Sequence, residues 1–207
     1  MSSILNKERF NALAEKWDSK PARVEGAMIF VDRILEHINK DIKSFDVLDY
    51  GCGSGLVSFG FADKVNSILG LDNSESMVEV YNNKAQMINL DNVQSKLHDI
   101  NKEELPSEKF DLVATNMTMH HIKDIKMFVE KLSASLRKDG HLFIADLFSE
   151  DGKFHSDNTG VEHFGFDTGH LISIFEEAGL KNISCEVLNN IEKPHNSYEV
   201  FIIKGMK

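Results

Sequence analysis

The sequence is poor in the residues that mark secreted or membrane-spanning proteins. It has two cysteines and three prolines among 207 residues. Because Cys52 lies inside a glycine-rich stretch, where a structural disulfide would be awkward, we expect it and Cys185 to be reduced thiols in a cytoplasmic protein. No apolar run approaches the ~20 residues that a membrane helix needs, and the charged residues 7–9 do not fit a signal peptide. We therefore expect no membrane partner.

Positive charge is also in short supply. The chain carries 23 Lys and Arg against 33 Asp and Glu, a formal net charge of −10. Since a nucleic-acid binder usually carries a basic face, this balance argues against DNA or bulk RNA as a partner, although it leaves room for a local basic patch. No repeat, low-complexity tract or linker divides the chain. The length and composition therefore predict one globular domain over residues 1–207.

The stretch over residues 45–55 reads FDVLDYGCGSG. It indicates a buried strand that ends at Asp49, a turn made mostly of glycine, and a helix that starts near Ser54 or Leu56. Glycine is needed where the chain takes a positive φ or lets a ligand approach the backbone. A helix N-terminus after such a turn offers free N–H groups and a positive dipole end. The arrangement therefore suits a nucleotide-like ligand.

Two classes of ligand use such a turn, and the spacing separates them. The dinucleotide fingerprint G-x-G-x-x-G needs a third glycine at position 56, which is Leu56. The sequence matches acid-x-G-x-G-x-G instead, with Asp49, Gly51, Gly53 and Gly55. This pattern resembles motif I of the class I S-adenosylmethionine-dependent methyltransferases.

A second acid closes the next expected strand, over residues 65–71. Asp72 follows it, where a carboxylate can accept hydrogen bonds from both ribose hydroxyls of an adenosyl group. NAD uses the same position, so Asp72 alone does not choose between the two classes. The run 70–77 resembles the segment after motif I of the methyltransferases, which implies that Asn73 and Met77 lie near the adenine. Ordinary core packing is the alternative for Met77.

Two further expected strands end in residues that the resemblance assigns to the cofactor. Asp99 and Ile100 follow the strand 93–97, and by resemblance the carboxylate accepts from the adenine amine while Ile100 covers the ring; a surface acid capping a turn is the alternative. The strand 110–116 resembles motif IV, which implies that the Asn116 backbone lies near the methyl end. The Asn-Pro-Pro-aromatic sequence of enzymes that methylate base amines or protein side chains is absent, which favours the small-molecule type.

His120 and His121 come just after this strand. Histidine titrates near neutral pH, so either residue is a candidate general base or substrate contact. The alternative is that they cap the next helix or pack beneath the loop. Because adjacent side chains point in different directions and no acid-rich motif accompanies them, we expect no metal site.

The rest of the chain predicts helices and strands that complete the sheet. An amphipathic helix ends in a turn at 137–141, and a strand at 142–147 follows. Two last strands, 181–187 and 198–203, are joined by a linker over 189–196.

Two flanking regions are expected to cover the site. Residues 1–40 predict helices. The resemblance implies that these helices form a lid, with Trp17 near the substrate or simply as a helix anchor. The irregular segment 148–166, with His155 and His163, predicts a substrate-covering loop. We thus divide the domain into the lid (1–40), a cofactor-binding core (41–147) and a substrate-side loop, helix and β-hairpin (148–207).

The resemblance covers residues 45–204 and implies an α/β, Rossmann-like, doubly wound fold. Its sheet has seven mostly parallel strands in the order 3-2-1-4-5-7-6, with an antiparallel last strand. The implied cofactor is S-adenosylmethionine, and the implied reaction is methyl transfer to a small-molecule acceptor by in-line displacement. The implied cofactor-binding residues are Asp49, Gly51, Cys52, Gly53, Gly55, Asp72, Asn73, Met77, Asp99, Ile100 and Asn116. By resemblance, Asp49 orients the methionine part of the cofactor.

Two other functions stay open at this point. One is an NAD(P)-dependent oxidoreductase, against which Leu56 speaks. The other is a non-catalytic S-adenosylmethionine-binding sensor or partner protein. We expect a monomer or a homodimer.

Overall fold

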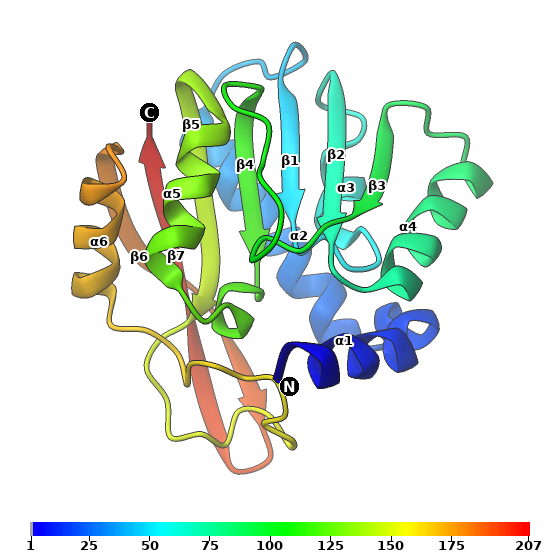
Figure 1. Cartoon of the computed structure of the whole chain (residues 1–207), viewed down its shortest axis with the longest axis vertical. Helices are drawn as coiled ribbons and strands as arrows, with labels where there is room; N and C mark the ends of the chain where they lie inside the picture. The colour runs from blue at the N-terminus through cyan, green and yellow to red at the C-terminus, as the bar shows by residue number, and fades with distance from the viewer. Residues whose placement is uncertain (1) are drawn as a thin grey trace.

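The computed structural model describes residues 2–207, with side chains from Lys7 onward. A seven-stranded sheet in the order β3-β2-β1-β4-β5-β7-β6 forms its centre (Figure 1). The strands are β1 (Asp46–Tyr50), β2 (Ser67–Asp72), β3 (Val93–Leu97), β4 (Phe110–Asn116), β5 (Leu136–Leu147), β6 (Lys181–Lys193) and β7 (Asn196–Met206). The helices are α1 (Ser2–Leu13), α2 (Pro21–Ile38), α3 (Leu56–Phe61), α4 (Glu75–Met87), α5 (Ile125–Ser135) and α6 (Thr168–Glu177), with 3-10 turns η1 (Ala14–Ser19) and η2 (Met119–His121). The predicted fold class and strand order are confirmed.

The first five strands are parallel to their neighbours, and β7 runs antiparallel between β5 and β6. Central strands of such a sheet are apolar on both sides because helices cover both faces. Val47 and Leu48 of β1 show this, since both are buried and each belongs to a different core cluster. The strand order reverses between β1 and β4, which is where open α/β sheets bind their ligands.

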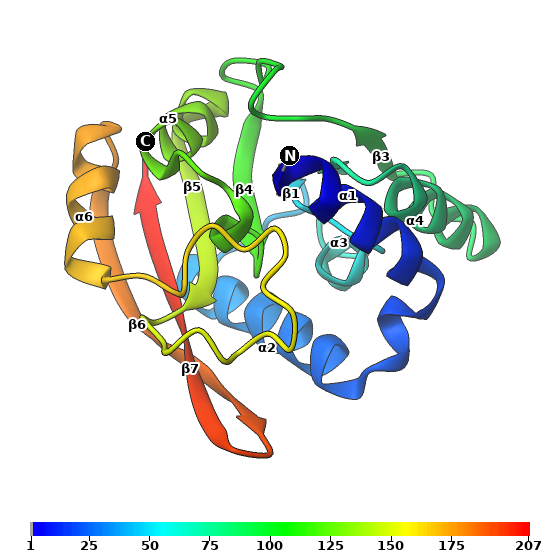
Figure 2. The same cartoon turned by 60° about the horizontal axis from the view of Figure 1, so that its bottom comes forward.

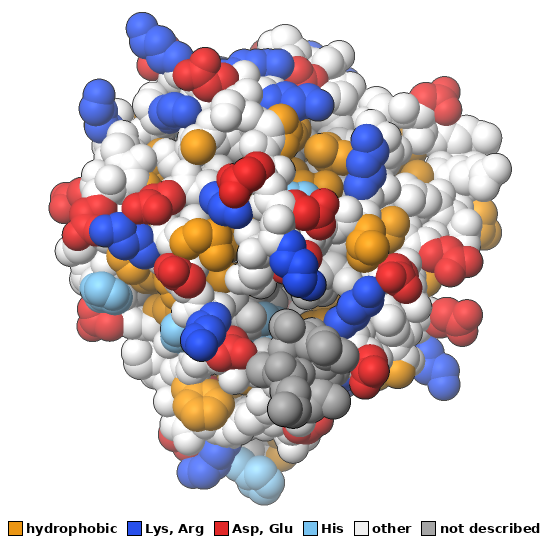
Figure 3. All heavy atoms as spheres, in the orientation of Figure 1, with side chains coloured by type: hydrophobic (Ala, Val, Ile, Leu, Met, Phe, Trp, Pro, Cys, Tyr) orange, Lys and Arg blue, Asp and Glu red, His pale blue; other side chains and the backbone are white. Residues whose placement is uncertain are grey.

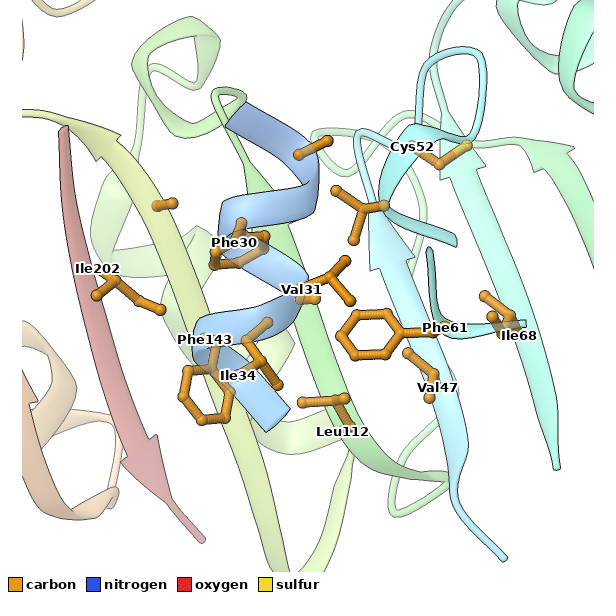
Figure 4. Packing of buried hydrophobic residues seen from close by; sticks show 14 of the residues in the cluster. Phe30, Val31, Ile34, Val47, Cys52, Phe61, Ile68, Leu112, Phe143 and Ile202 are labelled. Atoms are coloured by element: carbon orange, nitrogen blue, oxygen red, sulfur yellow. The ribbon is translucent and has the colours of Figure 1, made fainter. Parts of the chain in front are cut away.

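The two faces of the sheet bury different helices. Figure 4 shows Phe30 and Ile34 of α2 over Val47 of β1, Leu112 of β4 and Phe143 of β5. Side chains of α5 and α6 fill the cluster on the opposite face. Fully burying one such side chain contributes roughly 1.5–3 kcal/mol, so the two clusters hold the strand ends, and the residues beyond them, in fixed positions. None of the helices in the described part of the chain is long and apolar enough to cross a membrane.

The helix α1 and the loop 148–166 lie at one end of the sheet. Figure 1 shows the arrows of β1, β2 and β4 pointing toward α1, and Figure 2 shows α1 and the loop on that same side. Two segments far apart in the sequence thus flank the carboxyl ends of the central strands.

Two expected turns are strand in the structure, which corrects the sequence analysis. The predicted turn at 137–141 lies inside β5, because its backbone pairs with the chain end: the Asp139 N–H donates to the Lys207 carbonyl and the Lys207 N–H to the Gly140 carbonyl. The predicted linker at 189–196 forms the close of a hairpin, in which β6 extends to Lys193 and β7 begins at Asn196.

Candidate active site

The glycine turn after β1 is shaped by contacts that leave no room for side chains. The N–H groups of Gly51 and Cys52 both donate to the Leu71 carbonyl, at 2.7 and 3.1 Å, which ties the turn to β2. Gly51 has φ +72°, and a Cβ there would collide with the side chain of Thr118. Gly53 also has a positive φ, of +51°. The turn therefore brings backbone, rather than side chains, to the carboxyl end of β1.

A cavity of about 370 Å³ opens beside this turn. Most of the residues predicted for the cofactor line it: Asp49, Gly51, Cys52, Gly53, Asp72, Asn73, Met77, Asp99, Ile100 and Asn116. The candidates Trp17, His120, His121 and His155 line it as well. The strand ends and the two flanking segments thus meet around one space.

Gly55 and His163 do not line the cavity, contrary to expectation. A Cβ on Gly55 (φ +92°) would strike the rings of Phe59 and Tyr81, so this glycine allows α3 to pack against α4. The His163 imidazole contacts the Ile122 carbonyl through Nε2 at 2.9 Å, and its backbone N–H donates to the His120 carbonyl. His163 therefore supports the loop that carries His120 and is turned away from the cavity.

Asp72 presents a buried carboxylate to the cavity. One oxygen accepts the Gly53 N–H at 2.9 Å and the other accepts the Ser74 N–H at 2.9 Å. Burial raises the pKa of Asp72, against the effect of these N–H groups. Because a carboxylate has about four lone-pair sites, two remain for a ligand with two neighbouring hydroxyl groups.

Asp49 is less available, because α3 uses its carboxylate. One of its oxygens accepts from the Ser58 N–H at 3.1 Å and from the Ser58 hydroxyl at 2.6 Å. Burial raises the pKa of Asp49 to about 6, with Ser58 opposing the shift. The other carboxylate oxygen is left for a ligand or a water molecule at the cavity wall.

The loop after β3 is held by Tyr50, the last residue of β1. The Ile100 N–H donates to the Tyr50 hydroxyl at 3.1 Å, which fixes the loop after β3. Asp99 in that loop is half-buried and pairs with Lys102 at 2.7 Å. Burial raises the pKa of Asp99, but the hydrogen bonds from Lys102 and Asn101 outweigh it and lower the pKa overall.

The segment between α1 and α2 is fastened over the glycine turn. The Ser54 hydroxyl donates to Asp18, and Lys84 of α4 bridges Asp18 at 2.6 Å and the Ser54 carbonyl at 2.8 Å. The Arg23 guanidinium lies 3.5 Å above the Trp17 ring. The Asp18 carboxylate therefore anchors this N-terminal segment, which includes Trp17, beside the glycine turn.

His120 forms a buried pair with Asp146 at the end of β5. Nδ1 of the imidazole lies 2.8 Å from one carboxylate oxygen, and the His120 N–H donates to the other at 3.1 Å. Burial raises the pKa of Asp146, but the interactions with His120 outweigh it and lower the pKa overall. Since an ionised carboxylate only accepts, Nδ1 carries the proton. Nε2 is buried with no hydrogen-bond partner in the described structure.

Two more imidazoles surround His120. The ring centres of His121 and His155 lie 4.1 and 5.0 Å from that of His120. Burial lowers the pKa of His121 to about 3 and that of His155 to about 4. Both rings are therefore neutral near pH 7. No group of three His, Cys, Asp or Glu side chains within residues 7–207 is arranged to hold a metal ion.

Several cavity residues gave no signal in the sequence. They come from α1, the residue before α2, the loop 148–166 and the β6–β7 hairpin: Arg9, Phe10, Lys20, Phe154, Leu188, Ile191, Lys193 and Val200. Residues 189–196, which include Ile191 and Lys193, were expected to be a linker, and the residues in this list do not form a spacing that marks a site.

Comparisons with known proteins agree with this geometry. A family model described as "Methyltransferase domain" matches residues 42–179. An uncharacterized methyltransferase of Schizosaccharomyces pombe is 31% identical over 198 residues, spanning 87% of this chain and 70% of that protein. A ubiquinone biosynthesis O-methyltransferase of Coxiella burnetii is 27% identical and spans 67% of this chain, but this chain covers only 60% of its length. A crystal structure of an S-adenosylmethionine-dependent methyltransferase from Aquifex aeolicus superposes with a TM-score of 0.69 at 22% identity, covering 95% of this chain and 97% of that one.

Proposed function

The chain belongs to the class I S-adenosylmethionine-dependent methyltransferases, and we propose that it transfers the methyl group of this cofactor to a small-molecule acceptor by in-line displacement. The observation that carries the proposal is that Asp72 and His120, whose Nε2 has no hydrogen-bond partner in the described structure, line one cavity. The Asp72 carboxylate suits the ribose of an adenosyl ligand, and the His120 imidazole suits the removal of a proton from an acceptor.

The cavity residues fit S-adenosylmethionine. Asp72 has two lone-pair sites left for the ribose hydroxyls once it has accepted from Gly53 and Ser74. Asp99 would accept from the adenine amine, with Ile100 against the ring. The positive φ of Gly51 and Gly53 keeps Cβ atoms out of the space between. Bound there, the cofactor supplies an electrophilic methyl group on a positively charged sulfur.

The methionine end of the cofactor would lie at the glycine turn and the N-terminal segment. Asp49 faces it with its free oxygen and would accept from the ammonium group directly or through water. The Trp17 indole nitrogen lies 3.9 Å from the place of a Cβ on Gly53, so the Trp17–Arg23 stack adjoins the turn. Arg23 is then placed to bind the carboxylate.

His120 would act at the other end as the general base. With Nδ1–H held by Asp146, Nε2 of the neutral imidazole would take the proton from an acceptor hydroxyl or thiol as its oxygen or sulfur bonds to the methyl carbon and the bond from that carbon to the cofactor sulfur breaks. General bases of this kind contribute typically 10²–10⁴-fold. Holding the acceptor in line is worth more, ~7–11 kcal/mol in favourable cases, and that is the contribution of the surrounding apolar residues of the cavity.

A small acceptor agrees with the way the cavity is covered. The segment at Trp17 and the loop around His155 both line it, so two segments narrow the approach to the strand ends, which suits a small acceptor better than a polymer. The name of the Coxiella burnetii relative, a ubiquinone biosynthesis O-methyltransferase, also points to a small acceptor with an oxygen nucleophile.

The proposal is tested by following S-adenosylhomocysteine formation with a panel of small acceptors. We expect the His120→Asn variant to lose about 10²-fold or more in kcat on a hydroxyl or thiol acceptor, with cofactor affinity unchanged. The Asn amide can still donate to Asp146, which keeps the loop in place. His170→Asn, on the exposed side of α6, is the matched control. Product formation that is equally fast in the His120→Asn variant would rule out the base; no product from any acceptor would argue against catalysis.

A further inference from the structure

The charges that line the cavity are separated by sign. The acids Asp49, Asp72 and Asp99 stand at or just after the ends of β1, β2 and β3, whereas the cations come from the N-terminal end of α2 and from β6. We name Lys20, Arg23 and Lys193 the cationic mouth. All three line the cavity, in a protein whose formal net charge is −10. Arg9 lines it too, and donates to the backbone carbonyl of Asp157 at 2.9 Å.

None of the three cations of the mouth forms an ion pair with a carboxylate within residues 7–207. Arg23 stacks on Trp17 and donates to its carbonyl at 3.1 Å, and Lys193 lies 4.5 Å above the ring centre of Phe154. Elsewhere the charges are mixed: Figure 3 shows Lys and Arg interspersed with Asp and Glu over the visible face. Three cations that line one cavity without a carboxylate partner differ from this mixed surface, and they favour a ligand with a negative charge.

The three cations are close enough to repel one another. The pKa of Lys193 is lowered by burial first, and then by the charges of Lys20 and Arg23. The pKa of Arg23 is lowered by burial and by Arg9, with only Asp18 opposing, and Asp18 is engaged with Lys84. An anion bound between them would relieve this repulsion, whereas a second cation would add to it.

The mouth connects to His120 through two aromatic side chains. Lys193 contacts Phe154, the Phe154 ring centre lies 4.8 Å from that of His155, and His155 lies 5.0 Å from His120. Leu188, Ile191 and Val200 of the β6–β7 hairpin line the same part of the cavity. An acceptor that spans this distance needs an apolar or aromatic body with a charged group at one end.

We infer that the acceptor carries an anionic group, a carboxylate or a phosphate, which the cationic mouth binds while the atom to be methylated lies at His120. This substrate class rests on the proposed function, because it places the cofactor at Asp72 and the acceptor beyond it. Arg23 adjoins the glycine turn and would also bind the cofactor carboxylate. Substitutions of Lys193 and Lys20 therefore test the binding of the acceptor separately from that of the cofactor.

The test uses three probes that share a phenyl ring and differ in charge: benzamide (neutral), benzoate (one negative charge) and phenyl phosphate (close to two). Each is titrated by NMR into the S-adenosylhomocysteine complex, and into the protein alone, at about 50 mM salt. We expect benzoate and phenyl phosphate to bind about tenfold or more tightly than benzamide. Phenyl phosphate binding more tightly than benzoate indicates a phosphate acceptor, and the reverse indicates a carboxylate.

The variant Lys193→Met keeps most of the length of the side chain and removes the charge at an exposed position. We expect it to weaken the two anions about fivefold, as loss of one accessible ion pair does, and to leave benzamide unchanged. Lys20→Met/Lys193→Met should weaken them further. Lys181→Met, at the other end of the same strand and exposed, is the matched control and should change nothing.

The inference is overturned if benzamide binds as tightly as the anions, or if Lys193→Met and Lys181→Met behave alike. It is also overturned if Lys193→Met weakens S-adenosylhomocysteine instead of the probes, because the cation then serves the cofactor. A wild-type protein that does not bind S-adenosylhomocysteine contradicts the proposed function, and the titrations of the protein alone still decide whether the mouth prefers anions.

Discussion

Replacing Asp72 by alanine should weaken cofactor binding by about 2 kcal/mol or more. In the proposed mode both carboxylate oxygens accept from ribose hydroxyls, and hydrogen bonds to a charged group are worth ~1.5–3 kcal/mol each. A loss of 2 kcal/mol corresponds to an increase of about thirtyfold in Kd. The variant also leaves the N–H groups of Gly53 and Ser74 without their acceptor, so the turn itself becomes less well ordered and the loss is a lower bound.

The assay is a calorimetric titration with S-adenosylhomocysteine, alongside urea unfolding of each variant. Asp91→Ala, an exposed acid in the turn before β3, is the matched control and should bind as the wild type does. Asp72→Asn separates two effects, because its amide keeps the volume but can accept only on one side. If folded Asp72→Ala bound the ligand within about twofold of the wild type, Asp72 would not be the ribose-binding residue.

Two further predictions concern the histidines. Asp146→Asn should lower kcat by about 10²-fold while the KM for the cofactor stays unchanged, because Asp146 positions His120 and touches no ligand itself; a parallel rise in KM would mean that the variant merely disturbs the fold. His121, whose pKa is lowered to about 3 by burial, stays neutral in the folded protein while the unfolded chain takes up a proton below pH ~6.5. Its contribution to stability is thus fully present above pH ~6.5 and is lost as the pH falls toward 3. The free energy of unfolding of the wild type should therefore fall relative to that of His121→Asn by about 2 kcal/mol between pH 7 and pH 5. Equal pH dependence of the two proteins in urea unfolding would contradict a buried neutral imidazole.

The strands of the core could be predicted because each one carries its own signal. Apolar runs such as those ending at Asp49 and Asp72 stop at an acid, and β3 and β4 have the predicted bounds. The start of β5 could not, since Asp139 and Gly140 are typical turn residues and Asp139 does take a positive φ of +62°. This stretch stays in the sheet because its backbone pairs with Lys207, which is far away in the sequence.

The cofactor side of the cavity was predictable for a related reason. Residues that follow parallel strands meet at one edge of the sheet, so Asp72 and Asp99 could be placed from the strands alone. The acceptor side depends on contacts between distant segments, such as Lys193 over Phe154 and His120 against His155. Sequence spacing carries no information on such contacts, which is why Lys193 was missed.

The same reasoning explains why Gly55 and His163 do not line the cavity. Gly55 fits the motif, but its missing side chain makes room for Phe59 and Tyr81. His163 lies in a segment that does cover the cavity, yet its ring turns to the Ile122 carbonyl. In both cases the segment was in the expected place, and the direction of the individual residue was decided by packing.

The central claim is that this cavity binds S-adenosylmethionine, and calorimetric titration of the wild-type protein tests it most directly, with NADH in a parallel cell. We expect micromolar binding of S-adenosylmethionine and none of NADH. Binding of NADH alone, or of neither ligand, would contradict the placement of an adenosyl-methionine ligand between Asp72 and His120.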